Sequence, residues 1–159
     1  MKFLICILLI FCSLKSYAYQ IPKDNKVTFD IIRKNKIIGS HSINFLENGD
    51  ELQITTNIKI EVKILFFPAY DFSHSSTEKW INDEFIQFEG HTDFEDEREY
   101  FIKGIDENDS FVANGMDGKI TMDINILPSN LWNKNILYEK ELFDIQKGIK
   151  RTIQVKELG

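Results

Sequence analysis

Apolar and polar residues alternate without interruption between residues 52 and 66. The even positions are Leu52, Ile54, Thr56, Ile58, Ile60, Val62, Ile64 and Phe66, and the odd positions before Leu65 are Gln53, Thr55, Asn57, Lys59, Glu61 and Lys63. Successive side chains of a β-strand point to opposite faces, so the pattern predicts one strand with a buried face and a solvated face. This run is far longer than the usual strand of about 5–6 residues, and we expect it to coil or bend as in a barrel or half-barrel.

Similar but shorter alternating segments flank this strand and are separated by turn residues. They predict strands at 27–31, 37–46, 70–80, 85–94, 99–105, 110–113, 119–124, 142–145 and 149–155. Asn48-Gly49 is a strong hairpin signal because both residues accept positive φ. Gly39, inside the second strand, predicts a bulge or a close approach of another backbone. The fold class is therefore all-β, an antiparallel meander that forms a strongly curved sheet or half-barrel.

One short helix is expected near residues 130–137. Pro128 precedes it, Ser129 is in place to cap it, and Leu131, Trp132 and Ile136 would form its apolar side.

The first 18 residues have the pattern of a secretory signal peptide. Lys2 precedes an apolar run that is too short to span a membrane, and Ser16 and Ala18 fit the positions that signal peptidase reads. Cleavage after Ala18 would leave residues 19–159 as a single β-rich domain in the periplasm or outside the cell, with no membrane span. Both cysteines, Cys6 and Cys12, lie in the removed segment, so the mature domain would be stabilised by burial and not by disulfides.

The net charge of the domain limits the kinds of partner that it can bind. The full chain has a net charge of −6, and loss of Lys2 and Lys15 with the signal peptide leaves 17 basic residues against 25 acidic ones. An acidic domain is unsuited to nucleic acid or to an anionic membrane surface.

Several local motifs resemble an exported bacterial family known only as domain of unknown function 6134, which is related to number 3108. They are Phe29-Asp30-Ile31, Ile38-Gly39-Ser40-His41 leading to Phe45, Ile60 to Phe66, Tyr70, His74, Glu78, Trp80, Leu127-Pro128, Trp132-Asn133, Leu142-Phe143-Asp144, Gln146 and Gly148. The resemblance implies a curved antiparallel sheet like the half-barrels of periplasmic lipoprotein carriers, and it implies no activity. Family members usually continue through a further hairpin, so we expect this chain to be C-terminally short and its last strand to be an exposed edge.

Motifs for chemistry are weak. His41, His74 and His91 lack the paired spacing of a zinc site, and the acidic run from Asp93 to Glu99 lacks the spacing of a calcium loop. There is no nucleophile elbow and no glycine-rich phosphate loop, so we expect no catalytic residue, no metal and no cofactor.

The most informative face belongs to the strand at 70–80. It combines aromatic bulk with polar groups, as an amphiphile-binding groove does and as a core with satisfied polar atoms also does. The candidate ligand-binding residues are Tyr70, His74, Glu78, Trp80 and Trp132. The leading hypothesis is a binding or carrier module for a lipid or other apolar molecule. The alternatives are an envelope scaffold that binds a partner protein through a sheet edge and, third, a hydrolase.

Overall fold

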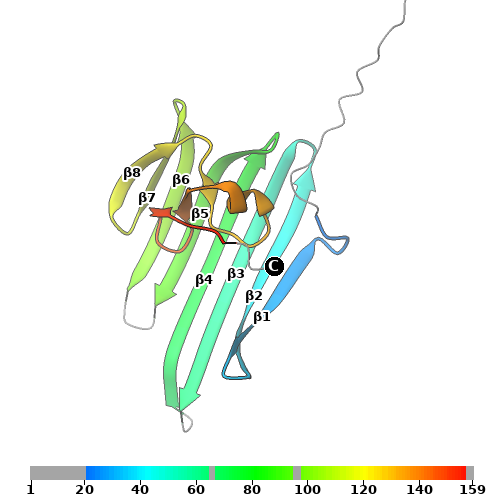
Figure 1. Ribbon diagram of the computed structural model, residues 1–159, viewed down its shortest axis with the longest axis vertical. Coiled ribbons are helices and arrows are strands. Elements are labelled where there is room, and N and C mark those ends of the chain that lie inside the picture. The colour runs from blue at the N-terminus through cyan, green and yellow to red at the C-terminus, as the bar shows by residue number, and fades with distance from the viewer. Residues whose placement is uncertain (1–20, 65–66, 95–97, 157–159) are drawn as a thin grey trace, which may run out of the picture.

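The computed structural model describes residues 21–64, 67–94 and 98–156, and these form two β-sheets (Figure 1). The larger sheet has eight antiparallel strands in sequence order, which confirms the predicted meander. They are β1 (Lys26–Arg33), β2 (Lys36–Asn48), β3 (Glu51–Ile64), β4 (Phe67–Ile81), β5 (Glu84–Phe94), β6 (Glu99–Glu107), β7 (Ser110–Gly115) and β8 (Gly118–Asp123). The smaller sheet contains β9 (Leu127–Pro128), β10 (Glu141–Asp144) and β11 (Ile149–Thr152), with β9 and β10 parallel.

The alternation along β3 sets the two faces of the large sheet as predicted. Leu52, Ile54, Thr56 and Ile58 are buried, and Lys59, Glu61 and Lys63 are exposed. Ile60 and Val62 are half-buried, and the side chains of Ile64 and Phe66 lie outside the described residues. The inner face of the sheet is therefore the one that carries the even-numbered residues of β3 and β4.

The turns between strands also form where the sequence predicts them. Lys34-Asn35, Asn82-Asp83 and Asn108-Asp109 all adopt positive φ, the backbone conformation of tight hairpin turns. Gly49 does the same between β2 and β3. The acidic residues 95–97 between β5 and β6 lie outside the described residues.

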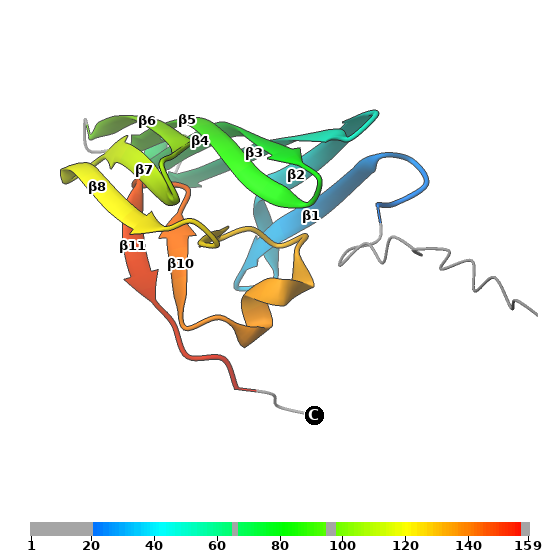
Figure 2. The same ribbon diagram turned by 90° about the horizontal axis from the view of Figure 1, so that it is seen from above.

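The small sheet packs beneath the inner face of the large sheet and closes the core (Figure 2). Phe143 on β10 is the centre of this packing: it is fully buried and its ring contacts those of Phe85, Phe88 and Phe111 at centroid distances of 6.3, 5.1 and 5.4 Å. Met122 and Ile145 complete this part of the core.

Two features of the predicted architecture differ in the structure. The large sheet is open, with β1 and β8 as its edges, and it is not strongly curled, so the half-barrel is not confirmed. The predicted helix at 130–137 does not form as an α-helix; a five-residue 3-10 helix, η1 (Lys134–Tyr138), forms instead. It is capped by Asn133, whose side chain accepts a hydrogen bond from the Asn135 N–H. Ser129, the expected cap, instead accepts a hydrogen bond from the Ile145 N–H.

The last hairpin lies where it was predicted, but its second strand is shorter. β11 ends at Thr152, whereas the alternation predicts a strand to residue 155. Within the described residues β11 pairs only with β10, so it is an edge strand as expected. Among those residues there is also no helix long and apolar enough to cross a membrane. Residues 1–20 lie outside the described part, so the signal peptide stays a prediction.

Gly39 lies where β2 approaches β3 too closely for a side chain. A Cβ atom at this position would clash with the Lys59 carbonyl oxygen and would stand 2.9 Å from the Ile60 Cα. The pairing of β1 with β2 also shifts next to it, between Ile31 and Ile32. Both expectations for Gly39, the bulge and the close approach, are confirmed. The shift also explains why Ile37, on the far side of the bulge, is 65% exposed although it has the same parity as buried His41.

Replacing Gly39 with Ala should lower the free energy of unfolding by about 1–3 kcal/mol, because the backbone of β3 must move away from the new methyl group. The control is Gly49→Asn at the β2–β3 turn, where nothing lies within 4 Å and Asn tolerates positive φ. Urea denaturation of both variants measures the difference. Equal stability of Gly39→Ala and the wild type would contradict the close approach.

Candidate functional site

The most unusual side chain on the inner face is Glu78. It is completely buried on β4, between Ile54 of β3 and Phe88 of β5. The Trp80 Nε1–H donates to its Oε2 over 3.0 Å, and the Asn130 side-chain amide lies 3.2 and 3.3 Å from its two oxygens. Removal from water is costly for a carboxylate, and these donors partly replace the lost solvent.

Burial raises the pKa of Glu78 to about 7, and hydrogen bonds from Trp80, Asn130 and Trp132 oppose the rise. The carboxyl group therefore changes protonation state close to neutral pH, unlike an exposed glutamate. A buried carboxyl with a strongly raised pKa is a feature that functional sites often share.

The segment after β9 brings the other members of this cluster to Glu78. Asn130 reaches the carboxylate, and its own Oδ1 accepts a hydrogen bond from the Asn133 N–H. Trp132 packs edge-on against Trp80, with 5.3 Å between ring centroids, and against Phe45 at 5.9 Å. Three of the five predicted residues, Glu78, Trp80 and Trp132, are thus brought together.

An open cleft of about 540 Å³ lies next to this cluster, at the end of the sheet that carries the β4–β5 and β6–β7 turns. Its apolar floor consists of Trp80 and Phe85 of the large sheet, Ile124 and Ile126 of the connection between the two sheets, and Leu127 of β9. Its rim is acidic and consists of Asp83, Glu84, Asp106, Asp109 and Glu139. None of the described residues that line this cleft is Lys, Arg or His. An adjoining hollow of the same volume shares Asn125, Ile126, Tyr138 and Glu139 with it and carries one base, Lys140.

The other two predicted residues lie elsewhere. His74 is buried four residues before Glu78, with its Nδ1 2.7 Å from Thr92 Oγ1 and its Nε2 3.0 Å from Ser76 Oγ. Burial lowers the pKa of His74 to about 4, so the ring is neutral. Tyr70 is half-buried and pairs with Val62, a further four residues along β4, so it does not join the Glu78 cluster.

The arrangement around His74 does not support hydrolysis. Ser76 is within hydrogen-bonding distance, but the second ring nitrogen faces Thr92 and not a carboxylate. Both His74 and Ser76 are almost inaccessible, with 2% and 3% of their surface exposed. A substrate could not reach this serine, and the base lacks the acidic partner of a catalytic triad.

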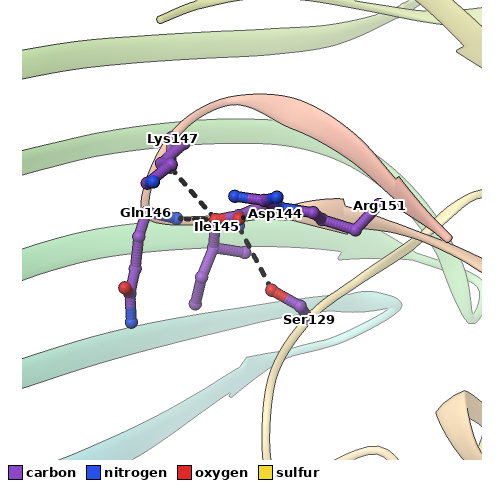
Figure 3. Close-up of polar contacts among 6 residues, drawn as sticks. All are labelled: Ser129, Asp144, Ile145, Gln146, Lys147 and Arg151. Atoms are coloured by element: carbon purple, nitrogen blue, oxygen red, sulfur yellow. Dashed lines mark hydrogen bonds and ion pairs between the residues drawn. The ribbon is translucent and has the colours of Figure 1, made fainter. Parts of the chain in front are cut away.

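Asp144, Gln146 and Gly148, which belong to the motifs of the family resemblance, lie at the end of β10 and in the turn that follows it. Figure 3 shows the contacts of Asp144. Asp144 Oδ1 accepts hydrogen bonds from the Gln146 and Lys147 N–H groups, and its Oδ2 accepts one from Arg151 Nε at 2.9 Å. Gly148 has positive φ and packs directly against Gly115 of β7. These residues attach the small sheet to the large one.

Comparison with known proteins gives one match. A family model described as Domain of unknown function (DUF6134) matches residues 29–159. The chain belongs to the DUF6134 family. No curated protein and no solved structure matches it. Of the motifs that carried the resemblance to DUF6134, Glu78, Trp80 and Trp132 meet in the cluster beside the cleft, and Leu127 lines the cleft. The relation to family 3108 stays a prediction.

Sequence reasoning missed Asn130 and the acidic rim. Asn130 stands in a stretch with a helical pattern, and nothing in that pattern indicates that it reaches a strand residue 52 positions earlier. The sequence does contain the information that predicts the rim, because alternate turns of a meander lie at the same end of the sheet. The acids of the turns at 82–84 and 106–109 are therefore placed together by topology.

Proposed function

We propose that this protein is an exported binding module whose ligand combines an apolar body with positive charge. The observation that carries the proposal is the cleft of about 540 Å³, with its apolar floor and its rim of five carboxylates. Its volume is within the range of small-molecule sites, which combine apolar walls with a few polar groups that fix orientation. Opposite charge on the ligand would satisfy the rim and would raise the rate of association.

The position and charge of the cleft change the carrier hypothesis in two respects. The small sheet covers the part of the inner face that carries Ile54, Trp80 and Phe88, so the ligand would enter at the end of the sheet and not along this part of the inner face. The acidic rim disfavours anionic lipids, so a cationic amphiphile is a better candidate than a general apolar molecule. Trp80 and Leu127 would contact the ligand, and Glu78 and Trp132 would hold Trp80 in place.

The scaffold alternative rests on a different observation, the edge strand β11. Its backbone pairs with β10 on one side only within the described residues, and edge strands are sites at which a second chain can add a strand. Lys150 and Arg151 on this strand form ion pairs with Glu141 and Asp144, which leaves less charge to oppose such pairing.

Binding of dodecyltrimethylammonium, measured below its micelle concentration, tests the proposed function. The protein has two tryptophans, and both belong to the cluster beside the cleft, so their fluorescence reports binding there. We expect saturable binding of this cation, and no saturable binding of dodecyl sulfate, which has the same chain and the opposite charge. Asp109→Asn and Glu84→Gln should each weaken binding by about two- to fivefold, as expected for exposed charge pairs.

The matched control is Asp117→Asn, which removes an exposed acid in the β7–β8 turn outside the cleft. It should leave binding unchanged. Equal binding of the two surfactants, or equal effects of Asp109→Asn and Asp117→Asn, would contradict a charge-selective cleft. Binding that persists at high salt without loss would do so as well, because salt screens exposed charges.

A further inference from the structure

The outer face of the large sheet, opposite the second layer, contains a shallow polar hollow of about 290 Å³. Most of the side chains around it are short, and Lys59 and His91 are the longer ones. The short ones are Ser40 and Ser42 on β2, Asn57 on β3, and Ser73 and Ser75 on β4. Ile58 and His74, whose side chains are buried in the core, also line it, so their backbone forms part of the floor. The hollow exists because most side chains in the middle of this face are short.

An aromatic platform stands at one side of the hollow. The His91 ring, which lines the hollow, is stacked on the Phe101 ring with 4.5 Å between centroids and an interplanar angle of 11°. His91 Nε2 is held 2.6 Å from Glu99 Oε1. The stack with His91 holds the Phe101 ring in place, and Phe101 is still 68% exposed. A rigid aromatic ring with an accessible face is suited to bind a flat apolar surface.

The register of the strands places the hollow and the platform in one line. Ser42 pairs with Asn57, Asn57 with Ser75, Ser75 with His91, and His91 with Phe101. Four interstrand steps separate Ser42 from Phe101, which is about 19 Å. The neighbouring row contains Ser40, Lys59, Ser73 and Asp93, so its one base and its one acid balance in formal charge.

We propose that this strip binds a linear neutral glycan, with a sugar ring stacked on Phe101 and further rings over the serine-lined hollow. Sugar rings have an apolar face of C–H groups and an edge of hydroxyls that both donate and accept hydrogen bonds. Serine hydroxyls and the Asn57 amide also donate and accept, so they match that edge, and Phe101 matches the apolar face. The near balance of charge argues against a polyanion or a polycation. The site is separate from the acidic cleft, which lies at the end of the sheet.

Titration of the full isotope-labelled protein with cellohexaose and, separately, with chitohexaose tests this inference by NMR. We expect fast-exchange shifts of backbone amides confined to residues of β2–β6 that border the strip, with affinity in the micromolar to millimolar range that a shallow site permits. Dextran sulfate is the probe for a purely electrostatic surface and should not bind there.

Phe101→Ala should weaken glycan binding roughly tenfold, and Phe101→Tyr should retain it, because the ring face is kept. Ser75→Arg should abolish binding by filling the hollow. The matched control is Ile105→Ala, which removes another exposed apolar side chain from the outer face of β6, 51% exposed and four residues from Phe101. It should bind like the wild type. The inference is overturned if neither hexasaccharide shifts these amides at millimolar concentration, if dextran sulfate binds in their place, or if Phe101→Ala and Ile105→Ala behave alike.

Discussion

Replacing Phe143 with Ala should destabilise the protein by about 3–5 kcal/mol, the usual cost of removing a fully buried phenylalanine ring. Phe143 has no exposed surface and contacts three other phenylalanine rings, two on strand β5 and one on strand β7 of the large sheet. Its loss would leave a cavity between the two sheets, and the rigid strands around it can close that cavity only in part. Urea denaturation monitored by tryptophan fluorescence measures the change.

Phe101→Ala is the control for this substitution. It removes the same ring from a position that is 68% exposed, so its effect on stability should be within about 0.5 kcal/mol. Comparable losses for the two variants would show that β10 does not provide the contact that holds the layers together. A Phe143→Ala variant as stable as the wild type would lead to the same conclusion about β10.

The second large effect concerns pH, because Glu78 and His74 are perturbed in opposite directions. Burial raises the pKa of Glu78 from 4.5 to about 7, so its contribution to stability is complete below pH 4.5 and is lost as the pH rises to 7. Burial lowers the pKa of His74 from 6.5 to about 4, so its contribution is complete above pH 6.5 and is lost as the pH falls to 4. Between pH 4.5 and 6.5 the two slopes, each about 1.4 kcal/mol per pH unit, oppose one another.

In the wild type the pH slopes of Glu78 and His74 oppose one another. Each single variant should therefore show the slope of the group that remains. In Glu78→Gln, stability should rise by about 3 kcal/mol from pH 4 to pH 6.5. In His74→Gln, which keeps groups able to bond Thr92 and Ser76, stability should fall by a similar amount from pH 4.5 to pH 7. His41, whose pKa burial also lowers, is present in both variants and adds a slope of the same sign as His74.

Free energies of unfolding at half-unit intervals of pH measure these slopes. The double variant should vary least with pH and serves as the control for the contributions of other groups. If Glu78→Gln and His74→Gln have the same slope as the wild type, the two groups titrate normally and are not buried as described.

The sequence predicted the sheet well because each strand carries its own evidence. The period of two along β3 assigns every side chain to a face, and a slip of one residue would expose Ile54 and bury Lys59. The turns could also be predicted from local sequence, because Asn82-Asp83 and Asn108-Asp109 are residue types that accept positive φ. Gly39 could be recognised because a glycine inside a strand often marks a bulge or a close backbone approach.

What the sequence could not show depends on contacts between distant segments. Leu131, Trp132 and Ile136 have helical spacing, but Asn130 and Asn133 bond backbone and buried groups instead, and such side chains compete with helix formation. Glu78 was recognised as a candidate, but its partner Asn130 was not, because the bond joins different layers. The curvature was overestimated because the length of a strand such as β3 does not by itself determine how strongly the sheet curls.

The order of the strands also has a consequence for how the chain folds. Every pairing in the large sheet joins strands that are consecutive in sequence, so the meander can grow by adding one hairpin at a time. The second layer must then close over it, since the bond between Glu78 and Asn130 spans 52 residues. Until that closure, the phenylalanines of β5 and β7 face water, and the nascent sheet is exposed to association with other chains. The time spent in that half-covered state, more than the stability of the finished fold, would set how much this protein depends on chaperones.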